Sequence, residues 1–137
     1  MLPNPRASPR ETADADEGIV VLVVEDEPVI REIASSALSE RGYRVVRAPN
    51  ADVAIGLMRV ISPDVLFSDI MMPGECDGFQ LAKVAKKLHP RIKVIMTSGY
   101  DFMLHDASTK RFGAVLQKPY HARQLIAEVA KAVCPHN

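Results

Sequence analysis

Apolar and polar positions divide this chain into alternating blocks, and each block has the spacing of either a strand or a helix. Short runs rich in β-branched residues alternate with longer segments in which apolar residues recur every three or four positions. The strand-like runs are 19–24, 43–47, 64–68, 92–96 and 114–117, and the helix-like segments are 28–41, 51–62, 78–88, 101–111 and a final one that ends at Val133. Five strands alternating with five helices predict a parallel sheet with helices on both faces, because right-handed crossovers place them there.

The composition of the strands and of the helix ends refines this prediction. The second strand carries Arg44 and Arg47 and is expected at an edge of the sheet, whereas the other four are almost wholly apolar, as in strands covered on both faces. Pro28 suits a first helical turn, Gly42 a helix stop and Asn50 an N-cap. The inward face predicted for the first helix consists of Ile30, Ile33, Ala34, Ala37 and Leu38.

Length and charge limit the classes of protein that fit. The 137 residues suffice for one domain, which we place at 19–133, between a flexible polar tail at 1–18 and a short C-terminal tail at 134–137. Lys plus Arg and Asp plus Glu both number 17, so there is no basic excess to predict direct nucleic-acid binding. The longest apolar run falls far short of the ~20 residues that span a bilayer, so we expect no membrane insertion and a cytoplasmic location.

Chemically active side chains follow four of the predicted strands, at the point where each strand ends. Glu25 and Asp26 follow the first strand, and Asp69, Thr97 and Lys118 follow the third, fourth and fifth. Open parallel α/β sheets bind their ligands in a crevice at the carboxyl ends of the strands. We therefore expect these five side chains to share one site.

The chemistry of these side chains suits phosphoryl transfer. A carboxylate such as that of Asp69 can attack phosphorus and form an acyl phosphate. Carboxylates held ~4 Å apart repel by about 4 kcal/mol at an effective dielectric of ~20, so the acid cluster needs a compensating cation. Oxygen ligands suit Mg²⁺, which would also polarise the incoming phosphoryl group. Thr97 and Lys118 would supply a hydroxyl and an ammonium to stabilise charge on the phosphoryl oxygens.

Four short segments give the chain a specific resemblance to a known family. They are ValValGluAspGlu at 23–27, SerAspIleMetMetPro at 68–73, ThrSerGlyTyr at 97–100 and LysProTyr at 118–120. With them, the region from 19 to 133 resembles a response-regulator receiver domain of two-component signalling. The resemblance implies a flavodoxin-like (βα)5 doubly wound parallel sheet with strand order 2-1-3-4-5, and often a cis bond before Pro119.

The resemblance also implies a role for each residue of the site. Asp69 would be the phosphoacceptor, Thr97 the switch hydroxyl and Lys118 the lysine that pairs with the phosphoryl group. The Mg²⁺ ligands would be Glu25, Asp26, Asp69 and the main-chain carbonyl of Met71. The phosphoryl donor would be a phosphohistidine on a sensor histidine kinase or a histidine phosphotransfer protein. The protein would then be no enzyme beyond catalysing its own phosphorylation and dephosphorylation.

The output of the domain is less clearly encoded. Receivers commonly have Tyr or Phe three residues before the lysine, where this chain has Val115, and Tyr100 is a candidate substitute. Because the last predicted helix ends at Val133, we expect a single-domain protein that signals by altered protein–protein binding or passes phosphate on, as a monomer or a phosphorylation-dependent dimer. The expected output contacts are Tyr100, Arg111, Val115, Gln117, Tyr120, His121 and Arg123.

Three other classes of function fit these residues less well. A haloacid-dehalogenase-like phosphatase needs a second Asp two residues after the nucleophile, where this chain has Met71. A dinucleotide-binding domain needs a glycine-rich turn after the first strand, where GluAspGluPro would repel a pyrophosphate. The remaining alternative is a receiver-like docking module that acts without phosphorylation, which the complete set of acids, hydroxyl and lysine disfavours.

Overall fold

The computed structural model of the chain describes residues 18–72, 77–99 and 113–134. These residues contain five strands and four helices. The strands are β1 (Val20–Val24), β2 (Arg44–Ala48), β3 (Val65–Asp69), β4 (Lys93–Ser98) and β5 (Gly113–Gln117). The helices are α1 (Pro28–Glu40), α2 (Ala51–Met58), α3 (Gly78–Leu88) and α6 (Ala122–Val133).

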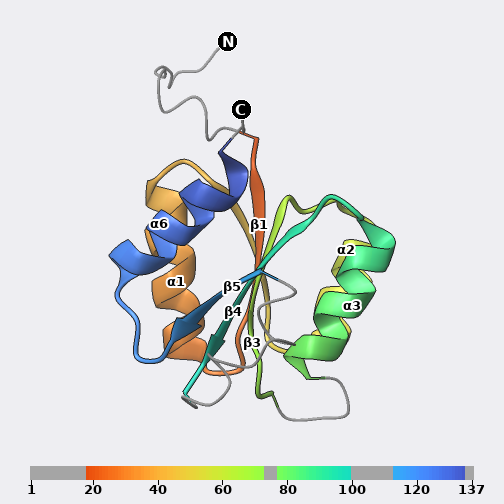
Figure 1. The fold of residues 1–137 in the computed structure, drawn as a ribbon, viewed down its shortest axis with the longest axis horizontal. Coiled ribbons are helices and arrows are strands. Elements are labelled where there is room, and N and C mark those ends of the chain that lie inside the picture. Colours follow the sequence, from red (N-terminus) through yellow and green to blue (C-terminus); the bar gives the residue numbers. More distant parts are fainter. Residues whose placement is uncertain (1–17, 73–76, 100–112, 135–137) are drawn as a thin grey trace.

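All five strands belong to one parallel sheet in the order β2-β1-β3-β4-β5. Helices α1 and α6 cover one face of this sheet and α2 and α3 cover the other (Figure 1). The predicted flavodoxin-like, doubly wound fold is therefore confirmed, together with its strand order and the place of β2 at an edge.

Two apolar layers hold the helices to the sheet, and β1 contributes to both. Its Leu22 and Val24 pack in the layer shared with α2 and α3, whereas Val21 and Val23 pack in the layer shared with α1 and α6. These four side chains are at most 1% exposed. Burial of one such side chain stabilises the fold by about 1.5–3 kcal/mol, so apolar packing holds the interior of the sheet together. Polar side chains are therefore expected at the ends of the strands.

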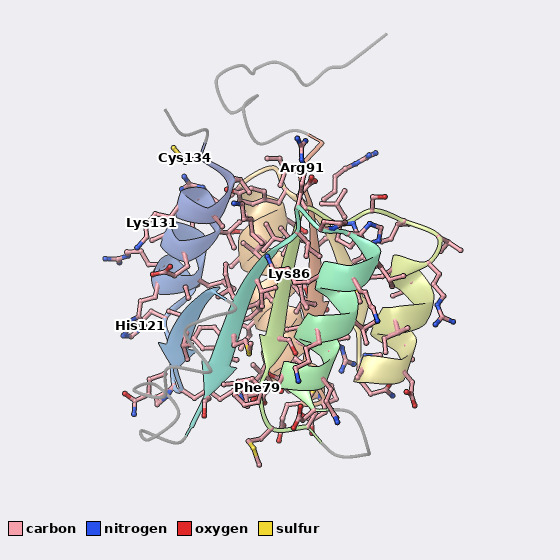
Figure 2. The ribbon with its side chains drawn as sticks, turned by 45° about the vertical axis from the view of Figure 1, so that its right-hand side comes forward. Phe79, Lys86, Arg91, His121, Lys131 and Cys134 are labelled. Carbon is pink, nitrogen blue, oxygen red and sulfur yellow. The ribbon has the colours of Figure 1, made fainter. Side chains whose placement is uncertain are left out.

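The two ends of the sheet carry different groups. Phe79, in the first turn of α3, lies at the end where the strands terminate, and Arg91 lies at the opposite end (Figure 2). The carboxyl ends of the strands therefore lie at the same end of the domain as Phe79, and the predicted site residues meet there.

The sequence signals at the helix ends are confirmed. Helix α1 begins at Pro28. Asn50 caps α2, since its Oδ1 accepts a hydrogen bond from the main-chain N–H of Val53 at 2.9 Å. Gly42 follows α1 with a φ of +96°, in the left-handed region that glycine adopts without strain.

The predicted inward face of α1 is wrong at one position. Ala34 and Leu38 are buried as expected, but Ile33 is 57% exposed. The buried stripe of α1 runs through Ala34, Ser35 and Leu38, and at 3.6 residues per turn Ile33 lies roughly 145° from the middle of this stripe, outside the face that packs on the sheet. There it lines a hollow with Tyr120.

Several predictions concern residues that the structure does not describe. The predicted helix at 101–111, the candidate contacts Tyr100 and Arg111, and the tail at 1–17 lie outside the described residues. Among the helices of the described ranges, none combines the length and the apolar character needed to cross a membrane.

Candidate functional site

Four neighbouring strands bring the predicted site residues to one end of the sheet. Glu25 directly follows β1, Asp69 ends β3, Thr97 lies in β4 and Lys118 directly follows β5. Asp69 and Thr97 are partners in the β3–β4 register, so their side chains point to the same face. The main chain is held here by hydrogen bonds from Glu25 N to Ala48 O (3.1 Å), Ile70 N to Thr97 O (2.9 Å) and Lys118 N to Ser98 O (2.8 Å).

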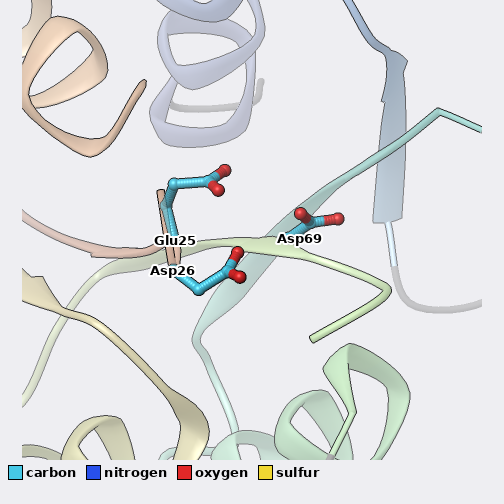
Figure 3. A group of neighbouring side chains, drawn as sticks. All are labelled: Glu25, Asp26 and Asp69. Carbon is cyan, nitrogen blue, oxygen red and sulfur yellow. The ribbon is translucent and has the colours of Figure 1, made fainter. Parts of the chain in front are cut away.

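Three carboxylates converge at the ends of β1 and β3. One oxygen each from Glu25, Asp26 and Asp69 lies within 4.8 Å of the other two. Figure 3 shows the three carboxylates directed into a common space. Glu25 and Asp69 are only 2% and 6% exposed, whereas Asp26 is exposed. The cluster is thus buried on one side and open to solvent on the other.

Lys118 partly neutralises this cluster. Its Nζ donates a hydrogen bond to Asp69 Oδ2 at 2.7 Å and lies 3.4 Å from Glu25 Oε1. Burial lowers the pKa of the Lys118 ammonium, but the hydrogen bond and the charge of Asp69, with the charge of Glu25, outweigh burial and hold the pKa above 10.5. Lys118 is therefore charged at neutral pH, and three carboxylates face one ammonium.

Glu25 has two structural partners in addition to its place in the cluster. Its Oε2 accepts a hydrogen bond from Glu27 N at 3.1 Å, and its Oε1 faces Lys118. Burial nevertheless raises the pKa of the Glu25 carboxyl above 4.5, because these partners offset only part of the desolvation and Asp69 adds repulsion. A divalent cation beside Glu25 would relieve that repulsion.

Thr97 has a buried hydroxyl for which the described residues offer no hydrogen-bond partner. The residue is 1% exposed, and its Oγ1 is unsatisfied within the described part of the chain. Buried polar groups are paired in most proteins, so an unpaired one calls for an explanation. A ligand with acceptor oxygens beside Asp69 would provide the missing partner.

The start of α3 fixes the position of Asp69, and sequence reasoning missed this role. Gly78 N donates to Ile70 O at 2.8 Å, and a Cβ on Gly78 would overlap Asp69 O and approach Ile70 Cα to 2.7 Å. The helix start is itself held by a capping box between Asp77 and Gln80. Only glycine permits this close approach of α3 to the end of β3.

The predicted output residues Val115 and Tyr120 lie on opposite faces of the sheet. Val115 is partly buried and packs against the layer of α2 and α3. Tyr120 packs against the layer of α1 and α6, with its ring edge-on to Phe67 at a centroid distance of 5.6 Å. The Lys118–Pro119 bond that precedes Tyr120 is cis, as the resemblance implied.

The pKa of Tyr120 gives a testable pH dependence. Burial, with the charges of Glu25 and Asp69, raises this pKa to about 12, from the ordinary value of 10.0. Between these values the unfolded chain loses the phenolic proton and the folded chain keeps it, so the stability that Tyr120 contributes is lost as the pH rises from 10 to about 12. The difference between the phenolate absorbance titrations of wild type and Tyr120→Phe should show this raised pKa. A difference curve centred at the ordinary value would contradict the environment described for Tyr120.

The residues of the crevice fit a bound magnesium ion. The cluster offers carboxylate oxygens alone, the donor type that Mg²⁺ prefers, and its open side leaves space for water and phosphate oxygens. Asp26, Asp69 and Glu25 are the side chains that could hold the ion. Met71, the fourth predicted ligand, is half exposed and its N–H donates to Asp69 Oδ1 at 3.3 Å, which places its main chain next to the cluster.

Fold and site together define a flavodoxin-like α/β domain with an acid cluster and a lysine at the carboxyl ends of its strands. Residues 21–130 match the sequence pattern of the family described as "response regulator receiver domain". The response regulator receiver protein CpdR of Brucella abortus is 32% identical over 113 residues, which cover 81% of this chain and 93% of CpdR. The chain belongs to the response regulator receiver domain family.

Two further similarities extend this finding. The sensor kinase CckA of Brucella abortus is 36% identical over 124 residues, which cover 87% of this chain. The crystal structure of the response regulator TrrA from Thermotoga maritima, in complex with Mg²⁺ and BeF, has a TM-score of 0.75 at 30% identity and covers 83% of this chain and 98% of that one. Several relatives are much longer, since the chain spans 13% of CckA and 24–26% of two others. With those proteins the similarity concerns one domain.

Proposed function

We propose that Asp69 accepts a phosphoryl group from a phosphohistidine, and that this change alters what the domain binds or passes the phosphate onward. The observation that supports the proposal best is the combination around Asp69. The side chain is buried, it is bonded to Lys118 at 2.7 Å, and it lies in register with a threonine whose hydroxyl is unpaired among the described residues. A phosphoryl group on Asp69 would give Lys118 and Thr97 acceptor oxygens.

The transfer is a substitution at phosphorus. A carboxylate oxygen of Asp69 forms the new P–O bond while the P–N bond to the donor histidine breaks. The electron pair of that bond stays on the ring nitrogen, and the imidazole, protonated at its other nitrogen, leaves neutral. In dephosphorylation, which is a separate step, water attacks phosphorus, the bond between phosphorus and the Asp69 oxygen breaks, inorganic phosphate leaves and the Asp69 carboxylate is regenerated. The domain would therefore catalyse only its own phosphorylation and dephosphorylation.

Each residue of the crevice would have a distinct role in this reaction. Lys118 holds Asp69 Oδ2 and would stabilise charge on the phosphoryl oxygens, and Thr97 Oγ1 would donate a hydrogen bond to one of them. Asp26, Asp69 and Glu25 would hold Mg²⁺ with the main chain of Met71. When bound, Mg²⁺ would neutralise the excess acid charge and polarise the phosphoryl group. Burial of Glu25 and Asp69 keeps water from competing on the inner side of the site.

A partner that carries the phosphohistidine needs a surface beside Asp69, and α1 offers one. Ile33 and Val29 are 57% and 68% exposed on this helix. An apolar hollow of about 330 Å³ is lined by Ile30, Ile33, Lys118, Pro119 and Tyr120. Exposed apolar groups gathered in this way are typical of protein–protein contacts. The partner would be a sensor histidine kinase or a histidine phosphotransfer protein. The cytoplasmic location of this protein, and its state as a monomer or a phosphorylation-dependent dimer, remain predictions.

The proposal is tested by supplying a small phosphoryl donor. Incubation of the wild type with acetyl phosphate and Mg²⁺ should add the mass of one phosphoryl group, stable in acid and labile in base, as an acyl phosphate is. An unchanged intact mass would favour the alternative, a docking module that acts without phosphorylation.

Removal of the exposed acid should weaken metal binding. Asp26→Asn is expected to raise the dissociation constant for Mg²⁺ roughly tenfold or more, because the crevice loses a ligand and one negative charge. Isothermal titration calorimetry measures the change. Asp52→Asn is the matched control, since Asp52 is an exposed acid in the first turn of α2, outside the acid cluster. Equal affinities for wild type and Asp26→Asn would exclude Asp26 as a ligand.

A further inference from the structure

Arg31 is a second cation near the acid cluster, and neither the sequence signals nor the proposed reaction assign it a role. It is the fourth residue of α1, and its main-chain N–H donates to Glu27 O at 2.9 Å. Its side chain is partly buried and turns back along the helix, where Nη1 donates a hydrogen bond to the main-chain carbonyl of Glu25 at 2.8 Å. The guanidinium thus contacts the loop that carries two of the three acids.

The place of Arg31 is not one that helix formation favours. The N-terminal turn of a helix carries partial positive charge, so a cation near it costs stability, typically ~0.3–1 kcal/mol at an exposed site. The first turn of α1 contains no acidic residue, although its N-cap, Glu27, is acidic. The contact with Glu25 O is a further compensating interaction, and it acts on the β1–α1 loop more than on the helix.

That hydrogen bond holds the peptide unit between Glu25 and Asp26. The amide on the other side of Glu25 is already fixed, since Glu25 N donates to Ala48 O at 3.1 Å. With the carbonyl held by Arg31, both ends of Glu25 are restrained and the direction in which the chain enters Asp26 is set. The Asp26 side chain is exposed, so the direction of its carboxylate depends more on the main chain than on packing.

We propose that Arg31 is a positioning residue for the metal site: by holding the Glu25 carbonyl it directs the Asp26 carboxylate toward Glu25 and Asp69, and so raises the affinity of the crevice for Mg²⁺. This inference rests on the proposed function. It adds a residue that touches neither the metal nor the phosphoryl group and acts through the main chain.

The charge of Arg31 and its hydrogen bond predict effects of opposite sign. If Arg31 acted only through its charge, its removal would make the crevice more negative and Mg²⁺ would bind more tightly. If Arg31 positions Asp26, its removal frees the loop and Mg²⁺ binds more weakly. The direction of the change therefore identifies the role.

The experiment is a titration of four proteins with Mg²⁺, followed by amide chemical shifts in two-dimensional NMR spectra. Arg31→Gln should raise the dissociation constant roughly tenfold, the usual cost of removing a group that orients a metal ligand. Arg31→Lys, which keeps the charge and one donor, should recover part of the loss. The control Arg41→Gln removes the same charge from an exposed position just past the other end of α1 and should bind as the wild type does.

A second readout separates positioning from a direct part in the chemistry. In Arg31→Gln the Mg²⁺ concentration for half-maximal phosphorylation by acetyl phosphate should rise by the same factor, while the rate at saturating Mg²⁺ stays that of the wild type. Tighter or unchanged Mg²⁺ binding in a folded Arg31→Gln would overturn the inference. If circular dichroism shows that this variant is unfolded, Arg31→Met is titrated in its place, and tighter or unchanged Mg²⁺ binding in a folded Arg31→Met overturns the inference instead. A wild type that binds no Mg²⁺ and takes up no phosphoryl group would refute the proposed function itself.

Discussion

Replacement of Asp69 by asparagine is expected to abolish phosphoryl uptake. The amide oxygen of Asn is a far weaker nucleophile than a carboxylate, and the product of its attack would not be an acyl phosphate. The side chain keeps its shape, so the packing around the end of β3 should persist. Intact-mass spectrometry after incubation with acetyl phosphate and Mg²⁺ should show no added phosphoryl group.

The control for Asp69→Asn is Asp52→Asn, which removes one exposed carboxylate outside the acid cluster and should be phosphorylated as the wild type is. Removal of the Asp69 charge should not unfold the domain, because Asp69 repels Glu25 as well as pairing with Lys118. If folded Asp69→Asn still gained one phosphoryl group, the acceptor would be another acid, with Asp26 and Glu25 the nearest candidates.

Gly78→Ala is expected to damage stability and phosphorylation together. A Cβ at this position would overlap the carbonyl of Asp69 and approach Ile70 Cα to 2.7 Å, and both obstacles are main-chain atoms that cannot rotate away. Overpacking of this kind costs about 1–3 kcal/mol of unfolding free energy. Displacement of Asp69 should also slow phosphorylation by roughly tenfold to a hundredfold, because misplacement of a reacting group by about 1 Å has effects of that size.

Gly56→Ala is the matched control for this substitution. Gly56 lies in α2, and a Cβ there would meet nothing within 4 Å. Alanine is the better helix former by about 1 kcal/mol, so Gly56→Ala should stabilise the domain and leave phosphorylation unchanged. Urea unfolding and the rate of mass gain with acetyl phosphate measure both effects. A Gly78→Ala protein with wild-type stability and rate would show that the end of β3 can move at no cost.

The order of the described strands and helices was predictable because short apolar runs, typical of buried strands, alternate along the chain with segments whose apolar residues recur every three or four positions, as in helices. β1 is an uninterrupted apolar run and β3 is apolar from Val65 to Phe67, as expected of strands covered on both faces. The site followed from the same pattern, since polar residues directly after such strands have to meet at one end of a parallel sheet. Asp69 and Thr97 accordingly lie in register on β3 and β4.

What could not be predicted depends on contacts that leave no periodic signal. Ile33 has the spacing of a core residue, but the sheet buries only a narrow stripe of α1 and Ile33 lies outside this stripe. The role of Gly78 depends on the separation between a helix start and a strand end, and that of Arg31 on a side chain turning back to a carbonyl. No spacing of residue types encodes either distance.

The most direct test of the central claim is to locate the phosphoryl group on the chain. Borohydride reduces an acyl phosphate of aspartate to homoserine, so treatment of the phosphorylated protein followed by peptide mass spectrometry marks the acceptor. Proposed chemistry at the end of β3 predicts homoserine at position 69 and at no other acid. Homoserine at position 26, 2-amino-5-hydroxypentanoic acid (the reduction product of a glutamyl phosphate) at position 25, or no conversion in a protein that had gained phosphoryl mass, would contradict it.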